Sequence, residues 1–95
     1  MTKPLHVTGI KNVVAKFRKI PVEVEAFRYG VDAPPPWFAK AEAEGTVKVN
    51  TDSAVIETLE GNMRAAKGDW VVRGVRDELY PCNPDIFNET YESVE

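Results

Sequence analysis

The sequence predicts an α+β domain, a twisted antiparallel sheet of about five strands with one helix packed on a face and a short helical turn near the C-terminus. Three observations lead to this class. Short runs that alternate apolar and polar residues recur along the chain, and tight-turn residues separate them. One segment rich in helix formers interrupts these runs directly after three consecutive prolines.

Length and composition bound the class of protein. Ninety-five residues are typical of one small domain, which we expect over residues 15–95. No apolar run approaches the roughly 18 residues that span a bilayer, and the start of the chain lacks the apolar stretch of a signal peptide. Cys82 is the only cysteine, which excludes an intramolecular disulfide and suits a reducing compartment. We therefore expect a bacterial cytoplasmic location.

Charge is distributed unevenly along the chain. Residues 1–19 carry five basic side chains and no acid, whereas the remaining residues carry 7 basic and 15 acidic side chains. We expect residues 1–14 to form a flexible basic arm, either a solvated extension or a contact for nucleic acid or an acidic protein. The acidic body disfavours a broad nucleic-acid surface, because phosphate contacts dominate such binding.

The first elements follow from alternation and from capping residues. Residues 22–27 alternate Val, Glu, Val, Glu and Ala, as in a half-buried strand, and Pro21 limits pairing at its start. A helix is predicted over 36–44, because proline suits a first helical turn and Gly45 suits the C-terminal cap. Packing on the sheet must stabilise this helix, since isolated helices this short are marginal in water.

The second half of the chain predicts consecutive strands joined by tight turns, which favours an antiparallel meander. In the middle run, Trp70 and Val72 share one face and Val71 lies on the other, so this strand is predicted at the centre of the sheet. The strands are expected at 46–50, 54–59, 63–66, 69–73 and 78–80, with a helical turn at 83–87 capped by Asn83 and a final strand at 91–94. The predicted core comprises Val22, Val24, Trp37, Ala41, Ile56, Leu59, Trp70, Val72, Leu79, Ile86 and Phe87.

Several stretches, in a fixed order, resemble a family of small phage and prophage proteins. They are residues 17–26, 56–61, 67–75, 78–87 and 90–92. Family members typically read Phe-Arg-Lys-Lys-Pro near the start, Thr-Leu-Glu-Gly in the middle, and Gly-Asp-Tyr before a Tyr-Pro-Cys segment. This chain departs at Ile20 and Trp70, and members mostly lack the first fourteen residues. The resemblance implies a phage or prophage origin and supplies no catalytic residues.

Residues that suggest chemistry each have a simpler structural explanation. His6 is the only histidine and lies in the arm, and Cys82 alone cannot hold zinc. Asp69 is expected to close a turn by accepting backbone hydrogen bonds. The remaining acids weighed for a paired-carboxylate site are expected to be solvated, and they are Asp77, Glu78 and Asp85. Three large rings are predicted to belong to the core rather than to an aromatic pocket, and they are Trp37, Trp70 and Tyr80.

Three functional hypotheses remain. The first is a non-enzymatic accessory protein that binds a host or phage protein, with no metal and no cofactor. The second is a small-ligand binder of the nucleotide-sequestering kind, in which Arg64, Arg73 and Arg76 hold phosphate beside Trp37. The third, an enzyme, ranks last. An exposed apolar patch favours the first hypothesis, and convergence of the arginines on one pocket favours the second.

Overall fold

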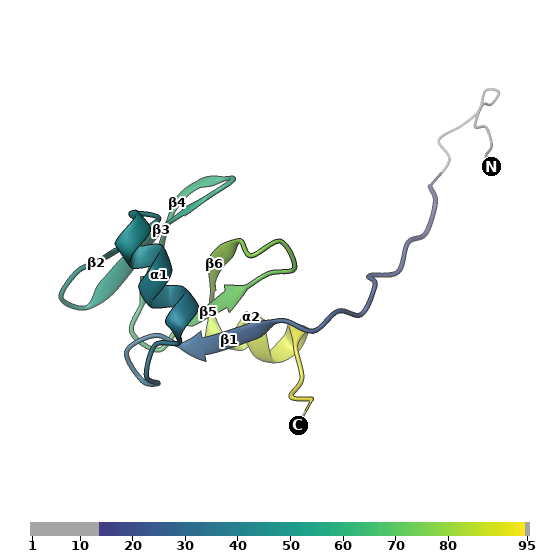
Figure 1. Cartoon of the computed structure of the whole chain (residues 1–95). Helices are drawn as coiled ribbons and strands as arrows, with labels where there is room; N and C mark the ends of the chain where they lie inside the picture. The colour runs from purple at the N-terminus through teal and green to yellow at the C-terminus, as the bar shows by residue number, and fades with distance from the viewer. Residues whose placement is uncertain (1–13, 95) are drawn as a thin grey trace.

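The structure, a computed structural model, describes residues 14–94 and shows an α+β fold built from two three-stranded antiparallel sheets and two helices. The first sheet has the order β1-β5-β6, with bounds Glu25–Arg28, Trp70–Arg73 and Leu79–Cys82. The second has the order β2-β3-β4, with bounds Val47–Val49, Ser53–Thr58 and Gly61–Ala66. The helices are α1 at Pro36–Glu44 and α2 at Pro84–Thr90 (Figure 1).

The strands follow one another as predicted, but they divide between two sheets instead of continuing as one meander. The expected hairpin over residues 63–73 is absent, because the turn after β4 bonds to the end of β1. Gly68 N donates to Tyr29 O at 2.7 Å, and Tyr29 N donates to Asp69 O at 2.8 Å. As a result β5 pairs with β1, with Ala26 opposite Val72, and β5 occupies the predicted central position in its sheet.

Helix α1 has the predicted bounds because its ends are encoded locally. Pro36 occupies the first helical position, where its missing N–H costs no hydrogen bond. Gly45 adopts the left-handed conformation at φ 87°, which ends the helix and lets Thr46 N donate to Ala41 O at 3.0 Å. Phe38 and Ala41 form the buried face of the helix, and the Trp37 side chain is half-buried.

One hydrophobic core joins α1 to both sheets. The Phe38 ring contacts Phe27 of β1 at a centroid distance of 4.9 Å in an edge arrangement, and it contacts Tyr29 at 5.9 Å. Nine buried residues form this cluster, and they are Phe27, Phe38, Ala41, Val47, Ala54, Ile56, Ala65, Val71 and Leu79. The core predictions for Ala41, Ile56 and Leu79 are therefore confirmed, and Val72 is also fully buried, on the opposite face of β5.

Three of the predicted core residues are exposed. Val22 precedes β1, because β5 ends at Arg73 opposite Glu25 and leaves no partner for the chain before it. Leu59 lies in the turn between β3 and β4, which begins one residue earlier than expected and continues into Gly61 at φ 108°. Ile86 points away from the sheet, since α2 turns the neighbouring Phe87 toward Trp70 instead.

The C-terminal segment differs from the prediction in length and ending. Asn83 caps α2 as expected, with its Oδ1 accepting a hydrogen bond from Asp85 N at 2.8 Å. The predicted single turn is a seven-residue helix, and the expected strand at 91–94 does not form. A second aromatic group holds this end of the chain, because Trp70 stacks on Phe87 at 4.1 Å and Tyr80 shares a 2.9 Å hydroxyl hydrogen bond with Tyr91.

Stability should fall at alkaline pH because the folded chain holds protons that the unfolded chain releases. Burial, then the hydrogen bond to Tyr91, raises the pKa of Tyr80 well above its usual value, and burial also raises the pKa values of Tyr29 and Cys82. This stabilisation is complete below the unfolded-state pKa values, near 8.5 for cysteine and about 10 for tyrosine, and it is lost as pH rises above them. We expect the melting temperature to fall between about pH 8 and pH 11, and Tyr80→Phe to flatten that fall. Equal slopes for both proteins in thermal melts would contradict this assignment.

Candidate functional site

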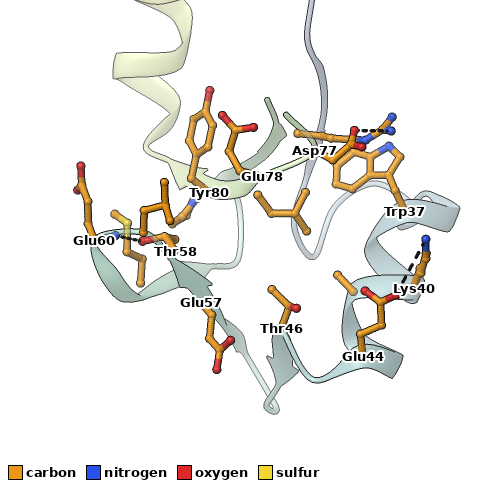
Figure 2. A pocket seen from close by; sticks show the side chains of 16 residues that line it. Trp37, Lys40, Glu44, Thr46, Glu57, Thr58, Glu60, Asp77, Glu78 and Tyr80 are labelled. Atoms are coloured by element: carbon orange, nitrogen blue, oxygen red, sulfur yellow. Dashed lines mark hydrogen bonds and ion pairs between the residues drawn. The ribbon is translucent and has the colours of Figure 1, made fainter. Parts of the chain in front are cut away.

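A cleft of about 730 Å³ opens between the two sheets, at the end that α1 covers. Strand β6 lies against β3 and β4, so the turn between β3 and β4 forms one end of the cleft and α1 forms the other. Figure 2 shows this arrangement, with Thr58 and Glu60 at one end and Trp37 and Lys40 at the opposite end. We refer to this feature as the cleft.

The cleft offers apolar surface to an incoming ligand. Leu59 is the most exposed of its apolar side chains, at 101% relative exposure, and Met63 on β4 is also exposed. The buried residues Ala41 and Leu79 supply the base of the cleft. An exposed leucine at a turn stabilises no core, so its burial against a partner is favourable on binding.

The lining of the cleft is acidic. Five acidic side chains face two basic ones, an excess of three negative charges. The acidic residues are Glu44, Glu57, Glu60, Asp77 and Glu78, and the basic residues are Lys40 and Arg73. A concave surface lined mostly by one sign of charge raises the local concentration of ligands of the opposite sign.

Both basic side chains of the cleft are already paired. The Arg73 guanidinium contacts Asp77 at 2.7 Å and Glu25 at 3.4 Å, and Lys40 lies 4.0 Å from Glu44. Across residues 14–94, by contrast, no cation lies within ion-pair distance of the Glu57 or Glu60 carboxylate. The negative charge near Leu59 is therefore left for a ligand to neutralise.

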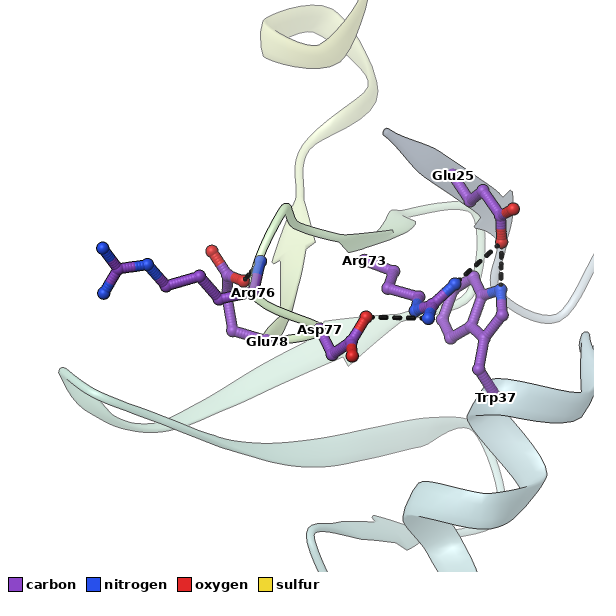
Figure 3. A network of polar contacts seen from close by, with 6 residues as sticks. All are labelled: Glu25, Trp37, Arg73, Arg76, Asp77 and Glu78. Atoms are coloured by element: carbon purple, nitrogen blue, oxygen red, sulfur yellow. Dashed lines mark hydrogen bonds and ion pairs between the residues drawn. The ribbon is translucent and has the colours of Figure 1, made fainter. Parts of the chain in front are cut away.

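Trp37 forms one wall of the cleft and is fixed by Glu25. Its indole Nε1–H donates to Glu25 Oε1 at 2.8 Å, and the same carboxylate oxygen accepts from Arg73 (Figure 3). The indole ring also packs edge-on against Phe27 at 5.6 Å. These contacts hold the ring in place before any ligand arrives, which lowers the entropy cost of binding.

The four residues predicted to bind a small ligand are placed differently from one another. Trp37 and Arg73 both line the cleft. Arg64 lies opposite Val55 in the second sheet and is exposed outside the cleft. Arg76 extends away from Arg73 (Figure 3), and its backbone N–H donates to Glu78 Oε1 at 2.8 Å. The three arginines thus do not converge on one pocket.

The other residues singled out from the sequence mostly have structural roles. Asp69 Oδ2 accepts from Ala66 N at 2.9 Å and closes the turn as expected. Asp77 pairs with Arg73, and Glu78 closes its own turn, so these acids do not form a catalytic pair. The aromatic residues separate, since Trp37 and Tyr80 line the cleft whereas Trp70 stacks on Phe87.

Cys82 is a half-buried thiol whose pKa is raised, first by burial and then by the negative charge of Asp69. A raised pKa keeps the thiol protonated and weakly nucleophilic. His6 and the predicted arm up to residue 13 lie outside the described residues. Within the described range, no three His, Cys, Asp or Glu residues are grouped to hold a metal ion.

The residues that sequence reasoning missed are those of the turn between β3 and β4. Leu59 is predicted in the core, and neither Glu57 nor Glu60 is predicted as a site residue. A leucine directly before Glu-Gly at a strand end was the available signal, because an apolar residue in a tight turn has no core to enter.

Comparison with protein-family models, with curated proteins and with solved structures found no match to this chain. No helix within residues 14–94 is both long enough and apolar enough to cross a membrane.

Proposed function

We propose that this chain is a small, non-enzymatic phage or prophage accessory protein that binds a host protein through the cleft, in the bacterial cytoplasm. The observation that carries the proposal is the combination of exposed Leu59 and Met63 with the unpaired carboxylates of Glu57 and Glu60. Apolar surface supplies affinity, and charge complementarity supplies steering and specificity. The partner segment that fits is a basic one with apolar side chains.

The charge of the cleft disfavours the alternative, a nucleotide-type ligand. Phosphate groups are held by free arginine or lysine side chains or by converging backbone N–H groups. Arg73 and Lys40 already contact carboxylates, and five acids line the same cleft. A phosphate group entering here would meet a repulsive field.

The hydroxyl groups of the cleft support binding rather than catalysis. Thr58 Oγ1 donates to Gly61 O at 2.7 Å and accepts from Glu60 N at 3.1 Å, so it stabilises the turn. The Tyr80 hydroxyl is engaged with Tyr91 at 2.9 Å. A nucleophilic hydroxyl needs an adjacent base that takes its proton, and neither group has that arrangement.

Reversing charge at the cleft should abolish capture of the partner. A photo-crosslinking residue replaces Leu59 in the full chain, which is expressed in infected or lysogenic cells, and cross-linked proteins are identified by mass spectrometry. We expect Glu57→Lys with Glu60→Lys to reduce the cross-linked product about tenfold or more, because it converts attraction into repulsion. The matched control is Glu42→Lys with Glu89→Lys, two exposed acids outside the cleft, and it should leave the product unchanged.

Two results would contradict the proposal. One is a cross-linked product that survives reversal at Glu57 and Glu60. The other is a rise in melting temperature when ATP or another nucleotide is added to the wild-type chain, since stabilisation by a ligand requires binding to the folded state. The second result would favour the nucleotide-binding alternative.

A further inference from the structure

Residues 14–24 form an extended arm with neither helix nor strand, and the arm leads away from the two sheets before β1 begins (Figure 1). The arm exposes several large apolar side chains. Relative exposure is 86% for Val14, 92% for Phe17 and 76% for Ile20. Such side chains on an extended segment gain nothing from the fold of their own chain, so they are available to another surface.

The charge of the arm is opposite to that of the cleft. Lys16, Arg18 and Lys19 lie among the apolar residues, and the first acid of the chain is Glu23. The arm therefore presents the basic and apolar chemistry that the cleft lacks, while Leu59, Glu57 and Glu60 present the acidic and apolar counterpart. Complementary charge of this kind selects and orients a partner.

The base of the arm is held in its outward direction. Lys19 Nζ lies 5.9 Å from the centroid of the Tyr91 ring, within the range of a cation–π contact. Ile20 and Val22 line a small hollow with Val75 and Tyr91, on a part of the domain distinct from the cleft. With its base placed there, the outer part of the arm projects toward a neighbouring molecule.

We propose that the arm of one copy of this chain docks in the cleft of a second copy, with Phe17 against Leu59 and with Lys16 and Arg18 near Glu57 and Glu60. This inference rests on the proposed function, because both use the same cleft. Each copy has one arm and one cleft, so a reciprocal exchange gives a closed two-fold dimer. The dimer competes with the host partner, and dilution or higher salt shifts the balance toward free clefts.

Charge-swapped variants of the full chain test the exchange by sedimentation equilibrium. Lys16→Glu with Arg18→Glu reverses the arm, and Glu57→Lys with Glu60→Lys reverses the cleft. We expect each variant alone to weaken dimerisation about tenfold or more relative to wild type. An equimolar mixture of the two variants restores the dimer, because each arm then meets a cleft of opposite charge. The control, Glu42→Lys with Glu89→Lys, dimerises like wild type.

The outcomes separate this inference from the proposed function. A wild-type chain that stays monomeric at every accessible concentration overturns the arm exchange and leaves the cleft free for a host partner. A wild-type dimer that the mixture fails to restore also overturns it, because another surface then holds the copies together. Restored dimerisation in the mixture supports it. Host-protein cross-linking at Leu59 that ignores reversal of Glu57 and Glu60 overturns the proposed function independently.

Discussion

Phe38→Ala is expected to lower the free energy of unfolding by about 3 to 5 kcal/mol, the largest loss that we expect from a single substitution. The Phe38 side chain is 2% exposed and contacts the rings of Phe27 and Tyr29. It is the main buried side chain that α1 contributes to the core, so truncation leaves a void and removes the attachment of a helix too short to be stable alone. Small domains have roughly 5 to 15 kcal/mol in total.

Urea denaturation followed by circular dichroism measures this change. The matched control is Phe17→Ala, the same truncation at a side chain that is 92% exposed, and we expect it to change stability by less than about 0.5 kcal/mol. Similar losses for the two variants would mean that α1 does not pack on the sheets through Phe38.

Trp70→Ala is expected to cost about 3 kcal/mol, near the lower end of the range for tryptophan truncation, because the ring is half-buried. The indole stacks on Phe87 at 4.1 Å with an interplanar angle of 7°, and the Arg28 guanidinium carbon lies 5.7 Å from its centroid. Helix α2 buries no side chain fully, so this stack is its principal attachment to the first sheet. Loss of the ring should loosen α2 together with the C-terminal residues.

A double-mutant cycle with Phe87→Ala isolates the stacking contribution. We expect a coupling free energy of about 0.5 to 1.5 kcal/mol between the two rings, measured from the thermal unfolding of the four proteins. A Trp70→Ala variant whose melting temperature moves by less than about one degree would show that the indole is a surface or ligand-binding group instead.

The sequence predicts the local features of this fold better than its long-range pairing. Helix α1 is predicted with its observed bounds because Pro36 and Gly45 encode its two ends within a few residues. The pairing of β1 with β5 is missed, since these strands lie more than 40 residues apart and no turn between them signals contact. The Lys67-Gly68 turn wrongly predicts a hairpin, because a turn motif indicates that the chain reverses, not which strand it joins.

The candidate site was harder to predict than the fold for the same reason. Arg73 and Trp37 are predicted from the sequence and do line the cleft, but the carboxylates that neutralise Arg73 come from β1 and from the turn before β6. Leu59 is predicted in the core because apolar character usually means burial. Only the start of the turn at Leu59, rather than one residue later, places it at the surface.

The central claim is that the acidic cleft accepts a basic, apolar polypeptide segment, and amide chemical shifts test it most directly. A synthetic peptide with the sequence of residues 14–22 is added to isotope-labelled full chain carrying Lys16→Glu and Arg18→Glu, so that its own arm does not compete. We expect shifts at residues 57–63 and at the Trp37 indole N–H, and none at Glu89 on the outer helix. Shifts confined to other surfaces, or cleft shifts produced by ATP and not by the peptide, would contradict the claim.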